Sequence, residues 1–138
     1  MATDGGVTAR VRDDGPHSLK VHIEVGGKSF LGDEPVSAGG TGMGPSPHDL
    51  LSAGLAECTA LTLRLYADRK AWPLGGVEVE VRHEVQPEAS PRDLFHRSVK
   101  LIGPLDDDQK ARLLDIADRC PVHRTLTTGS RVETKAIA

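Results

Sequence analysis

Apolar and polar residues alternate along the first part of the chain. Every second residue from Leu19 to Val25 is apolar and the residues between them are polar, which is the period of a half-buried strand. Turn-forming residues flank this segment, with DDGP at 13–16 and GG at 26–27. The pattern therefore predicts a strand at 19–25, a preceding hairpin arm at 7–12 and a short third strand at 28–31.

A long apolar segment follows a glycine-rich loop at 39–45. Ser46 suits a helix N-cap, Pro47 the first helical position, and Asp49 the first turn, where a carboxylate complements the helix dipole. Glu57 is the only charged residue from 50 to 63, and Trp-Pro at 72–73 is expected to end the helix. A helix with so little polar surface is normally buried on all sides. Because one antiparallel sheet covers only one side, we hypothesise that the chain dimerises around this helix.

In the second half of the chain, strand patterns are again followed by a helix pattern. Valine recurs at 77, 79, 81 and 85 among charged residues, and 95–102 is expected to be its hairpin partner. Asp106 and Gln109 form a capping pair for a second helix, whose apolar stripe is expected to hold Ala111, Leu114 and Ala117. A short helical turn and a strand at 131–137 follow. The order βββ-α-ββ-α-β predicts an α+β fold in one domain over 1–138.

Composition and charge narrow the function classes. The chain has 138 residues, of which 38% are hydrophobic, 27% charged and only 3% aromatic, with a formal net charge of −3. An acidic chain with few aromatic side chains is a poor partner for nucleic acid. The N-terminus shows no secretory signal and no segment is long enough to span a membrane. We therefore expect a cytoplasmic protein whose thiols are kept reduced.

The two cysteines are the first candidates for chemistry. Cys58 lies inside the long helix, on a face shared with leucines, and packing as a small hydrophobe is the simpler interpretation of that position. Cys120 precedes Pro121, which places it as an N-cap, where backbone N–H groups stabilise a thiolate. His123 and Arg124 add nearby positive charge. For Cys120 a reactive and a structural role are equally open.

Other ligand sites have weaker support. Two cysteines and two histidines could form a metal site, with one pair from Cys120 and His123 and the other from His48 and Cys58. The second pair is separated by ten residues of helix, or about 15 Å, which is too far for both residues to bind one ion. We therefore expect no metal. The glycine-rich loop lacks the Gly-Lys-Ser/Thr ending of a phosphate-binding loop and follows no βαβ strand, so anion binding there is a secondary alternative.

Two motifs resemble one known family. GPSPHDLLSAGLAECTALTL at 44–63 and RCPVHRTL at 119–126, with YADRKAWPL at 66–74 between them, are similar to the OsmC/Ohr family of osmotically inducible and organic-hydroperoxide-resistance proteins. The resemblance covers essentially the whole chain. It implies an OsmC-like intertwined homodimer with two long helices at its centre, wrapped by strands from both chains.

The resemblance also implies a reaction. By motif position, Cys58 attacks the peroxide and becomes a sulfenic acid, and Cys120 then forms a disulfide with it, which an external dithiol reduces without any cofactor. In the peroxidase branch a glutamate follows the helix-starting proline and orients an arginine from the N-terminal hairpin. Here His48 stands at the glutamate position, and Arg10 and Arg12 only loosely match the arginine. His48, His123 and Arg124 are the supporting candidates.

The sequence thus supports three functions. The first is a thiol-dependent peroxidase for organic hydroperoxides, with Leu51 and Leu55 lining an apolar pocket, acting in oxidative or osmotic stress protection. The second is a non-catalytic dimer that binds an apolar small molecule. The third is a stress-induced structural dimer in which the cysteines only pack. Disulfide formation on treatment with a hydroperoxide would separate the first from the others.

Overall fold

The computed structural model describes residues 6–137. The chain forms two compact units, and along the sequence the boundary falls between Leu51 and Ser52, inside the long helix α1 (Pro47–Arg69). The first unit holds the predicted N-terminal strands, and the second holds both cysteines.

The N-terminal unit is built on a three-stranded antiparallel sheet in the order β1-β2-β3. The strands are β1 (Arg10–Asp13), β2 (Val21–Val25) and β3 (Lys28–Gly32), and the short 3-10 helix η1 (Val36–Ala38) follows. All three predicted strands are therefore present. The first strand was expected to begin at residue 7, but it begins at Arg10, which is the first residue that pairs with β2, opposite Glu24.

The glycine-rich loop is organised by one buried carboxylate. Asp33 accepts hydrogen bonds from the hydroxyl of Thr41 at 2.6 Å and from the backbone N–H groups of Glu34, Thr41 and Met43. The Thr41 hydrogen bond and these backbone donors lower the pKa of Asp33 to about 2. The charged carboxylate thus stabilises the loop above pH 3.8, its ordinary value, and this contribution is lost as the pH falls toward 2.

Close backbone approaches explain two of the glycines in this loop. A Cβ at Gly40 would collide with the carbonyl oxygen of Glu34, and one at Gly44 would collide with that of Leu31. These residues let the loop fold back on itself. The loop therefore owes its composition to its own packing, and nothing in its described contacts supports the anion-binding alternative.

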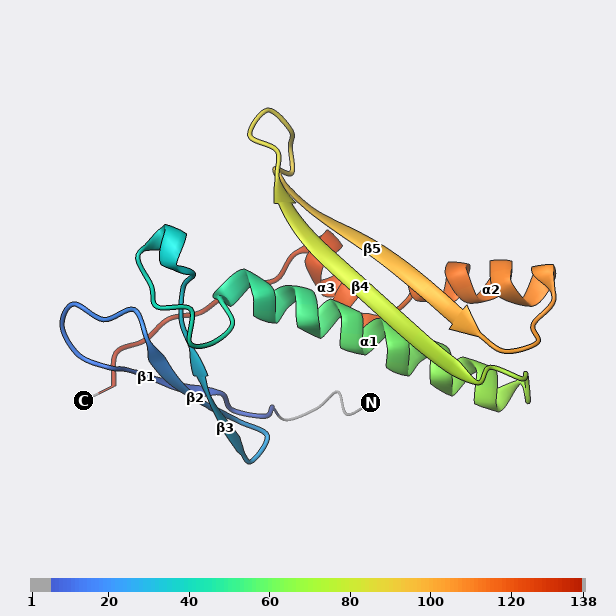
Figure 1. Ribbon diagram of the computed structural model, residues 1–138, viewed down its shortest axis with the longest axis horizontal. Coiled ribbons are helices and arrows are strands. Elements are labelled where there is room, and N and C mark those ends of the chain that lie inside the picture. The colour runs from blue at the N-terminus through green and yellow to red at the C-terminus, as the bar shows by residue number, and fades with distance from the viewer. Residues whose placement is uncertain (1–5, 138) are drawn as a thin grey trace. The chain divides into compact units, whose positions relative to one another are not determined.

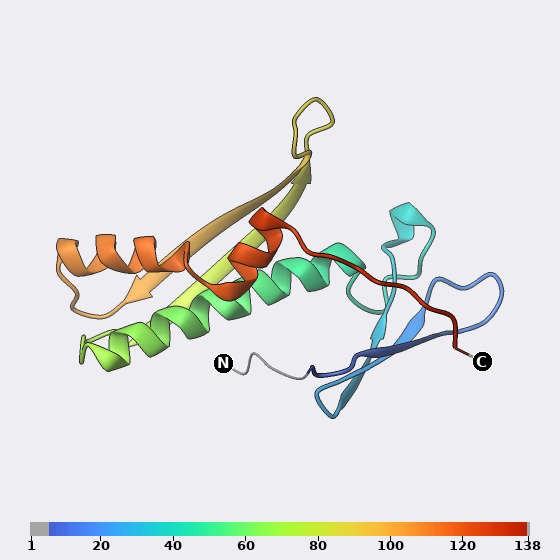
Figure 2. The same ribbon diagram turned by 180° about the vertical axis from the view of Figure 1, so that it is seen from behind.

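The C-terminal unit packs three helices on one face of a long β-ribbon (Figures 1 and 2). The ribbon consists of β4 (Gly76–Val85) and β5 (Asp93–Ile102), which pair antiparallel along their full length. Besides α1, the helices are α2 (Asp107–Ala117) and α3 (Pro121–Thr128). Residues opposite each other in the ribbon point to the same face, so the inward positions of both strands contribute to one core.

The ends of α1 follow from local chemistry. Ser46 Oγ accepts from the Asp49 backbone N–H, and the Asp49 carboxylate accepts from the Ser46 backbone N–H, so the predicted N-cap is confirmed. The helix ends at Arg69, before the predicted stop at 72–73. Ala71 adopts a left-handed conformation, with φ of 55°, and Trp72 N–H bonds to Ala67 O. This is a Schellman C-cap in which alanine occupies the position that glycine usually takes.

The second helix confirms its predicted cap but not its predicted stripe. Asp106 and Gln109 form a complete capping box. Of the expected buried stripe, Ala117 is buried, but Ala111 and Leu114 are exposed and Leu113 and Ile116 are buried in their place. The stripe with Leu113 and Ile116 buries more apolar surface than one built largely from alanine.

The core of the C-terminal unit divides into two clusters along α1 and the ribbon. The apolar cluster lies under α2 and consists of Leu63, Ala67, Leu74, Leu105, Leu113, Ile116 and Ala117. The cysteine cluster lies under α3 and consists of Leu55, Cys58 and Cys120, with Val81, Phe95, Val122 and Leu126 packed against it.

Two sequence expectations need correction. The helix α1 is not buried on every side within the single chain, because Leu61 and Leu65 are 46% and 49% exposed. Residues 131–137 form no strand, since an extended segment becomes a strand only when another strand pairs with it, and these residues have no such partner within the described chain. In the described residues, no helix is long and apolar enough to cross a membrane.

Candidate active site

The fold brings the two cysteines together from distant parts of the sequence. Cys58 comes from the middle of α1, and Cys120 lies in the turn between α2 and α3. Both are buried, 5% and 0% exposed respectively, and both are free thiols in one cluster. The two cysteines named by the resemblance therefore share one buried cluster.

Cys120 occupies the N-cap position that the sequence predicts. Its sulfur accepts a hydrogen bond of 3.3 Å from the backbone N–H of His123, and Pro121 begins the helix. The hydroxyl of Thr59 lies 3.8 Å from the same sulfur. Negative charge on this sulfur would be stabilised by the helix N-terminus and by these donors.

Cys58 has a different environment. Burial raises the pKa of the Cys58 thiol above its ordinary value of 9.0, and the neighbouring Cys120 sulfur adds to this because two adjacent thiolates repel each other. The backbone N–H of Val122 and the hydroxyl of Thr62 act in the opposite direction but do not outweigh burial. Thr62 Oγ1 is buried and makes no hydrogen bond of ordinary geometry among the described residues, so this hydroxyl is available to a charged or oxidised Cys58.

Arg97 is a site residue that the sequence analysis missed. It lies on the inward face of β5, opposite Val81 of β4, and its side chain is only 12% exposed. Its Nη1 donates to Thr59 Oγ1 at 3.1 Å. A sequence signal existed, because Arg97 interrupts the apolar positions 95, 99 and 101 at a period of two.

The second terminal nitrogen of the guanidinium, Nη2, connects Arg97 to the turn that carries Cys120. Nη2 lies 2.7 Å from Asp118 Oδ1 and 3.2 Å from His123 Nδ1. Because arginine can only donate, His123 Nδ1 is the acceptor, and its proton in the neutral ring is on Nε2. Arg97 thus ties β5 to α1 through Thr59 and to the start of α3 through His123.

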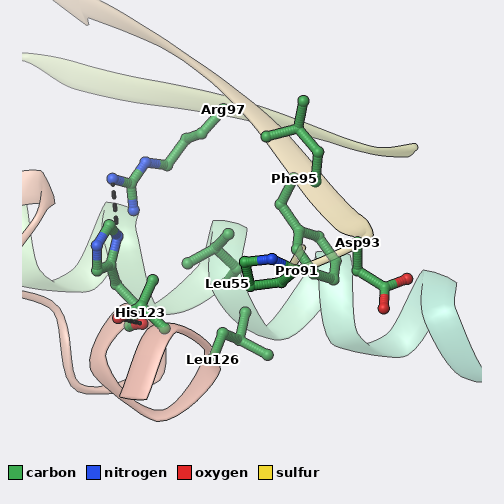
Figure 3. Close-up of a pocket in the computed structure, with 9 residues that line it drawn as sticks. Leu55, Pro91, Asp93, Phe95, Arg97, His123 and Leu126 are labelled. Atoms are coloured by element: carbon green, nitrogen blue, oxygen red, sulfur yellow. Dashed lines mark hydrogen bonds between the residues drawn. The ribbon is translucent and has the colours of Figure 1, made fainter. Parts of the chain in front are cut away.

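A cavity of about 520 Å³ lies between α1, β5 and α3. Figure 3 shows Arg97 and His123 beside each other on one edge, with Leu55, Phe95 and Leu126 around the rest. The complete lining is Leu55, Pro91, Asp93, Leu94, Phe95, Arg97, His123, Leu126 and Thr127. The volume is in the usual range for small-molecule sites. The predicted apolar pocket therefore contains Leu55, but Leu51 is exposed and does not line it.

The remaining candidates lie in different places. His123 is at the cavity, as just described. Arg124 is exposed, and its guanidinium makes no hydrogen bond or ion pair within residues 6–137. His48 is an exposed residue in the first turn of α1, in the part that belongs to the N-terminal unit. Arg10 and Arg12 are exposed on β1, also in that unit.

The Cys120–His123 pair does not have the form of a metal-binding pair. Cys120 Sγ receives the His123 backbone N–H, and the ring Nδ1 of His123 receives the Arg97 guanidinium. A metal would compete with both donors for these atoms. The cysteines, threonine and arginine instead make a thiol site with a cationic edge.

Comparison with known proteins agrees with this fold. Residues 40–135 match the family model described as OsmC-like protein. Among curated protein sequences, none matches this chain.

Solved structures share the architecture at low sequence identity. An OsmC-like protein from Mycoplasma pneumoniae is 21% identical, with a TM-score of 0.72 over 91% of this chain and 89% of that one. An organic hydroperoxide resistance protein OsmC from Legionella pneumophila is 22% identical, with a TM-score of 0.64 over 91% and 92%. An organic hydroperoxide resistance protein from Elizabethkingia anophelis is 16% identical, with a TM-score of 0.69 over 92% and 91%.

At these identities the structures establish the fold, and they confirm the predicted α+β architecture. The family model adds both motif regions, because it extends from the loop before α1 to residue 135, beyond α3, and it spans more than half of the sequence. The chain therefore belongs to the OsmC-like protein family.

Proposed function

We propose that this protein is a thiol-dependent peroxidase that reduces organic hydroperoxides. The observation that carries this proposal is the burial of two free thiols, Cys58 and Cys120, in one cluster beside a largely apolar cavity. Neither cysteine lines the cavity itself, but Leu55 belongs both to the cysteine cluster and to the cavity wall. Two cysteines next to a substrate-sized cavity can be oxidised and then form a disulfide. Relatives of the same fold that are named organic hydroperoxide resistance proteins give further support.

The proposed reaction has two steps that balance. The Cys58 thiolate attacks one peroxide oxygen, so that an S–O bond forms, the O–O bond breaks, and the alkoxide takes up a proton to leave as an alcohol. Cys120 then attacks the sulfenic sulfur of Cys58 as a thiolate. An S–S bond forms, the S–O bond breaks, and the leaving hydroxide takes up a proton to become water. An external dithiol reduces the disulfide and restores both thiols.

The cavity favours an organic over an inorganic peroxide. Leu55, Leu94, Phe95 and Leu126 give it apolar walls, and burial of an alkyl group there contributes about 0.8 kcal/mol per methylene. Hydrogen peroxide has no such group to bury.

The exposed side of α1 supports a second part of the proposal, a homodimer. Leu61 and Leu65 are exposed apolar residues on a helix of few charges. A second copy covering this face would remove them from water, in agreement with the dimer that the family resemblance implies.

The raised pKa of Cys58 favours an alternative function. A thiol that holds its proton at neutral pH is a weak nucleophile, and the same cavity could bind an apolar small molecule without turnover. The two functions differ in whether the cysteines change covalently.

Mass spectrometry after one equivalent of an alkyl hydroperoxide distinguishes them. The peroxidase is expected to lose two hydrogen atoms and to show a Cys58–Cys120 disulfide after proteolysis. Protein whose thiols were alkylated beforehand is the control and should not consume peroxide. Thiols that stay free, or that oxidise independently, would exclude the two-cysteine cycle and leave the binding function.

Two serine variants test the assignment of roles. Cys58→Ser should abolish peroxide consumption, while Cys120→Ser should still react once and accumulate a sulfenic acid that dimedone traps. The opposite result, with turnover lost only in the Cys120 variant, would show that the N-capping cysteine is the attacking thiol.

A further inference from the structure

The hydroxyl of Thr59 is fully engaged in the cysteine cluster. Its oxygen lies 2.7 Å from Leu55 O, to which it donates, and it accepts from Arg97 Nη1 at 3.1 Å. A hydroxyl has one proton and two lone pairs. The remaining lone pair faces the Cys120 sulfur at 3.8 Å, so in this state the Cys120 S–H donates to Thr59.

Loss of the Cys120 proton would reverse that hydrogen bond. A thiolate cannot donate, and the Thr59 hydroxyl can rotate from the Leu55 carbonyl toward the sulfur. The Arg97 guanidinium would hold the Thr59 oxygen in place and polarise the hydroxyl, which strengthens its donation to a negative partner. The His123 N–H already points at the same sulfur.

The guanidinium is itself held in one position. Its side chain is mostly buried, and it is bound by Thr59, by Asp118 at 2.7 Å and by His123 at 3.2 Å. Asp118 is exposed and neutralises the charge from the solvent side. A cation fixed in this way provides a constant orientation for its neighbours instead of an adaptable contact.

We propose that Arg97, acting through Thr59, is a positioning residue for the disulfide-forming step, in which Cys120 attacks the oxidised Cys58. This inference rests on the proposed peroxidase cycle and concerns its second step alone. Before oxidation the two sulfurs do not readily carry a negative charge at the same time, because two adjacent thiolates repel each other. Once Cys58 is a neutral sulfenic acid, that repulsion is gone and Cys120 can carry the charge that Thr59 and the His123 N–H stabilise.

A purely structural role for Arg97 makes a different prediction. If Arg97 only connects β5 to α1 and α3, its replacement would lower stability and slow both steps together. A positioning role slows the second step more than the first, and at Thr59, which does not line the cavity, it leaves the first step unchanged. Single-turnover kinetics separates the two, because sulfenic acid formation and disulfide formation are measured independently.

The experiment mixes reduced protein with one equivalent of cumene hydroperoxide and quenches it at successive times. Dimedone adducts report the sulfenic acid, and mass spectrometry reports the disulfide. The variants are Arg97→Met and Thr59→Val, which keep volume, with Arg97→Lys and Thr59→Ser as conservative variants that keep the charge and the hydroxyl. Arg82→Met is the matched control, since Arg82 is an exposed arginine in the same ribbon.

In the Met and Val variants we expect disulfide formation to slow about tenfold, the scale of one charge-assisted hydrogen bond. Sulfenic acid formation should stay within about twofold of wild type in Thr59→Val, because Thr59 does not line the cavity, and should slow less than disulfide formation in Arg97→Met. The conservative variants should recover part of the rate, and Arg82→Met should match wild type. Equal slowing of both steps, or unchanged disulfide formation, would overturn the role of Arg97. Wild-type protein that forms neither species would instead overturn the peroxidase proposal itself, so the two failures are distinguishable.

Discussion

The two core clusters use the same elements but differ in chemistry. Both are made by α1, by the β4–β5 ribbon and by one further short helix, α2 for the apolar cluster and α3 for the cysteine cluster. The apolar cluster contains only aliphatic and aromatic side chains. The cysteine cluster replaces part of that apolar surface with two thiols, the Thr59 hydroxyl and, at its edge, the Arg97 guanidinium.

This difference shows where stability and reactivity are placed. Burying apolar surface contributes to folding without further requirements, whereas each buried polar group must find a partner. At the cysteine end the Thr59 hydroxyl, the Cys120 sulfur and the Arg97 guanidinium each have several hydrogen-bond partners. Thr62 Oγ1 beside Cys58 has none within residues 6–137. We infer that the apolar cluster holds the unit together and that the cysteine cluster depends on it for its geometry.

The largest expected effect is on activity, at the cysteine end. Cys58→Ala should abolish peroxide consumption, because alanine has no nucleophile, yet lower the free energy of unfolding by only about 1 kcal/mol. Peroxide assays and chemical denaturation on the same preparation measure both quantities. A large loss of stability would contradict the division between the two clusters.

The converse variant is at the apolar end. Leu113 is fully buried, and Leu113→Ala should lower the free energy of unfolding by about 3 kcal/mol through lost burial and a residual cavity. Well below the melting temperature its peroxide turnover should stay within about twofold of wild type. Leu114→Ala, at the exposed neighbouring position, is the control and should change stability little. If folded Leu113→Ala protein instead shows a clearly lower peroxide turnover than wild type, the two clusters are coupled.

The pH dependence sharpens the contrast within the cysteine cluster. Because burial keeps the pKa of Cys58 above its ordinary value of 9.0, the rate of sulfenic acid formation should rise about tenfold per pH unit from about pH 7 to about pH 9. The folded state holds this proton more tightly than the unfolded chain. Stability should therefore fall as the pH rises through the ordinary thiol value. A rate that is flat over this range would mean that Cys58 is already a thiolate.

The smallest predicted effect lies at the end of α1 next to the apolar cluster. Ala71 has a left-handed conformation that costs a non-glycine residue about 1 kcal/mol. Ala71→Gly should raise the free energy of unfolding by somewhat less than this, since glycine also loses more entropy on folding. Thermal unfolding measures the change, and the disulfide-forming rate should not move. A destabilised variant would show that the cap is not strained.

Local patterns predicted the elements well wherever one residue type dictates the geometry. The Ser46 N-cap, the Asp106–Gln109 capping box and the Cys120 cap were all expected from neighbouring residues and are present. Such contacts join residues three positions apart, so sequence spacing determines them. The buried stripe of α2 was predicted correctly only at Ala117, because two stripes compete on a short helix and the ribbon that it faces decides between them.

The sequence by itself determined the α+β class, the element order up to α3, the cap at Cys120 and, through two motifs, the candidate cysteines. Only the tertiary structure placed Cys58 beside Cys120, raised the pKa of Cys58 by burial, and brought Arg97 to Thr59. These contacts join residues 38 to 62 positions apart, and no local propensity specifies them. They exist because α1, α3 and β5 bury a common apolar surface, which fixes the polar side chains at its edge.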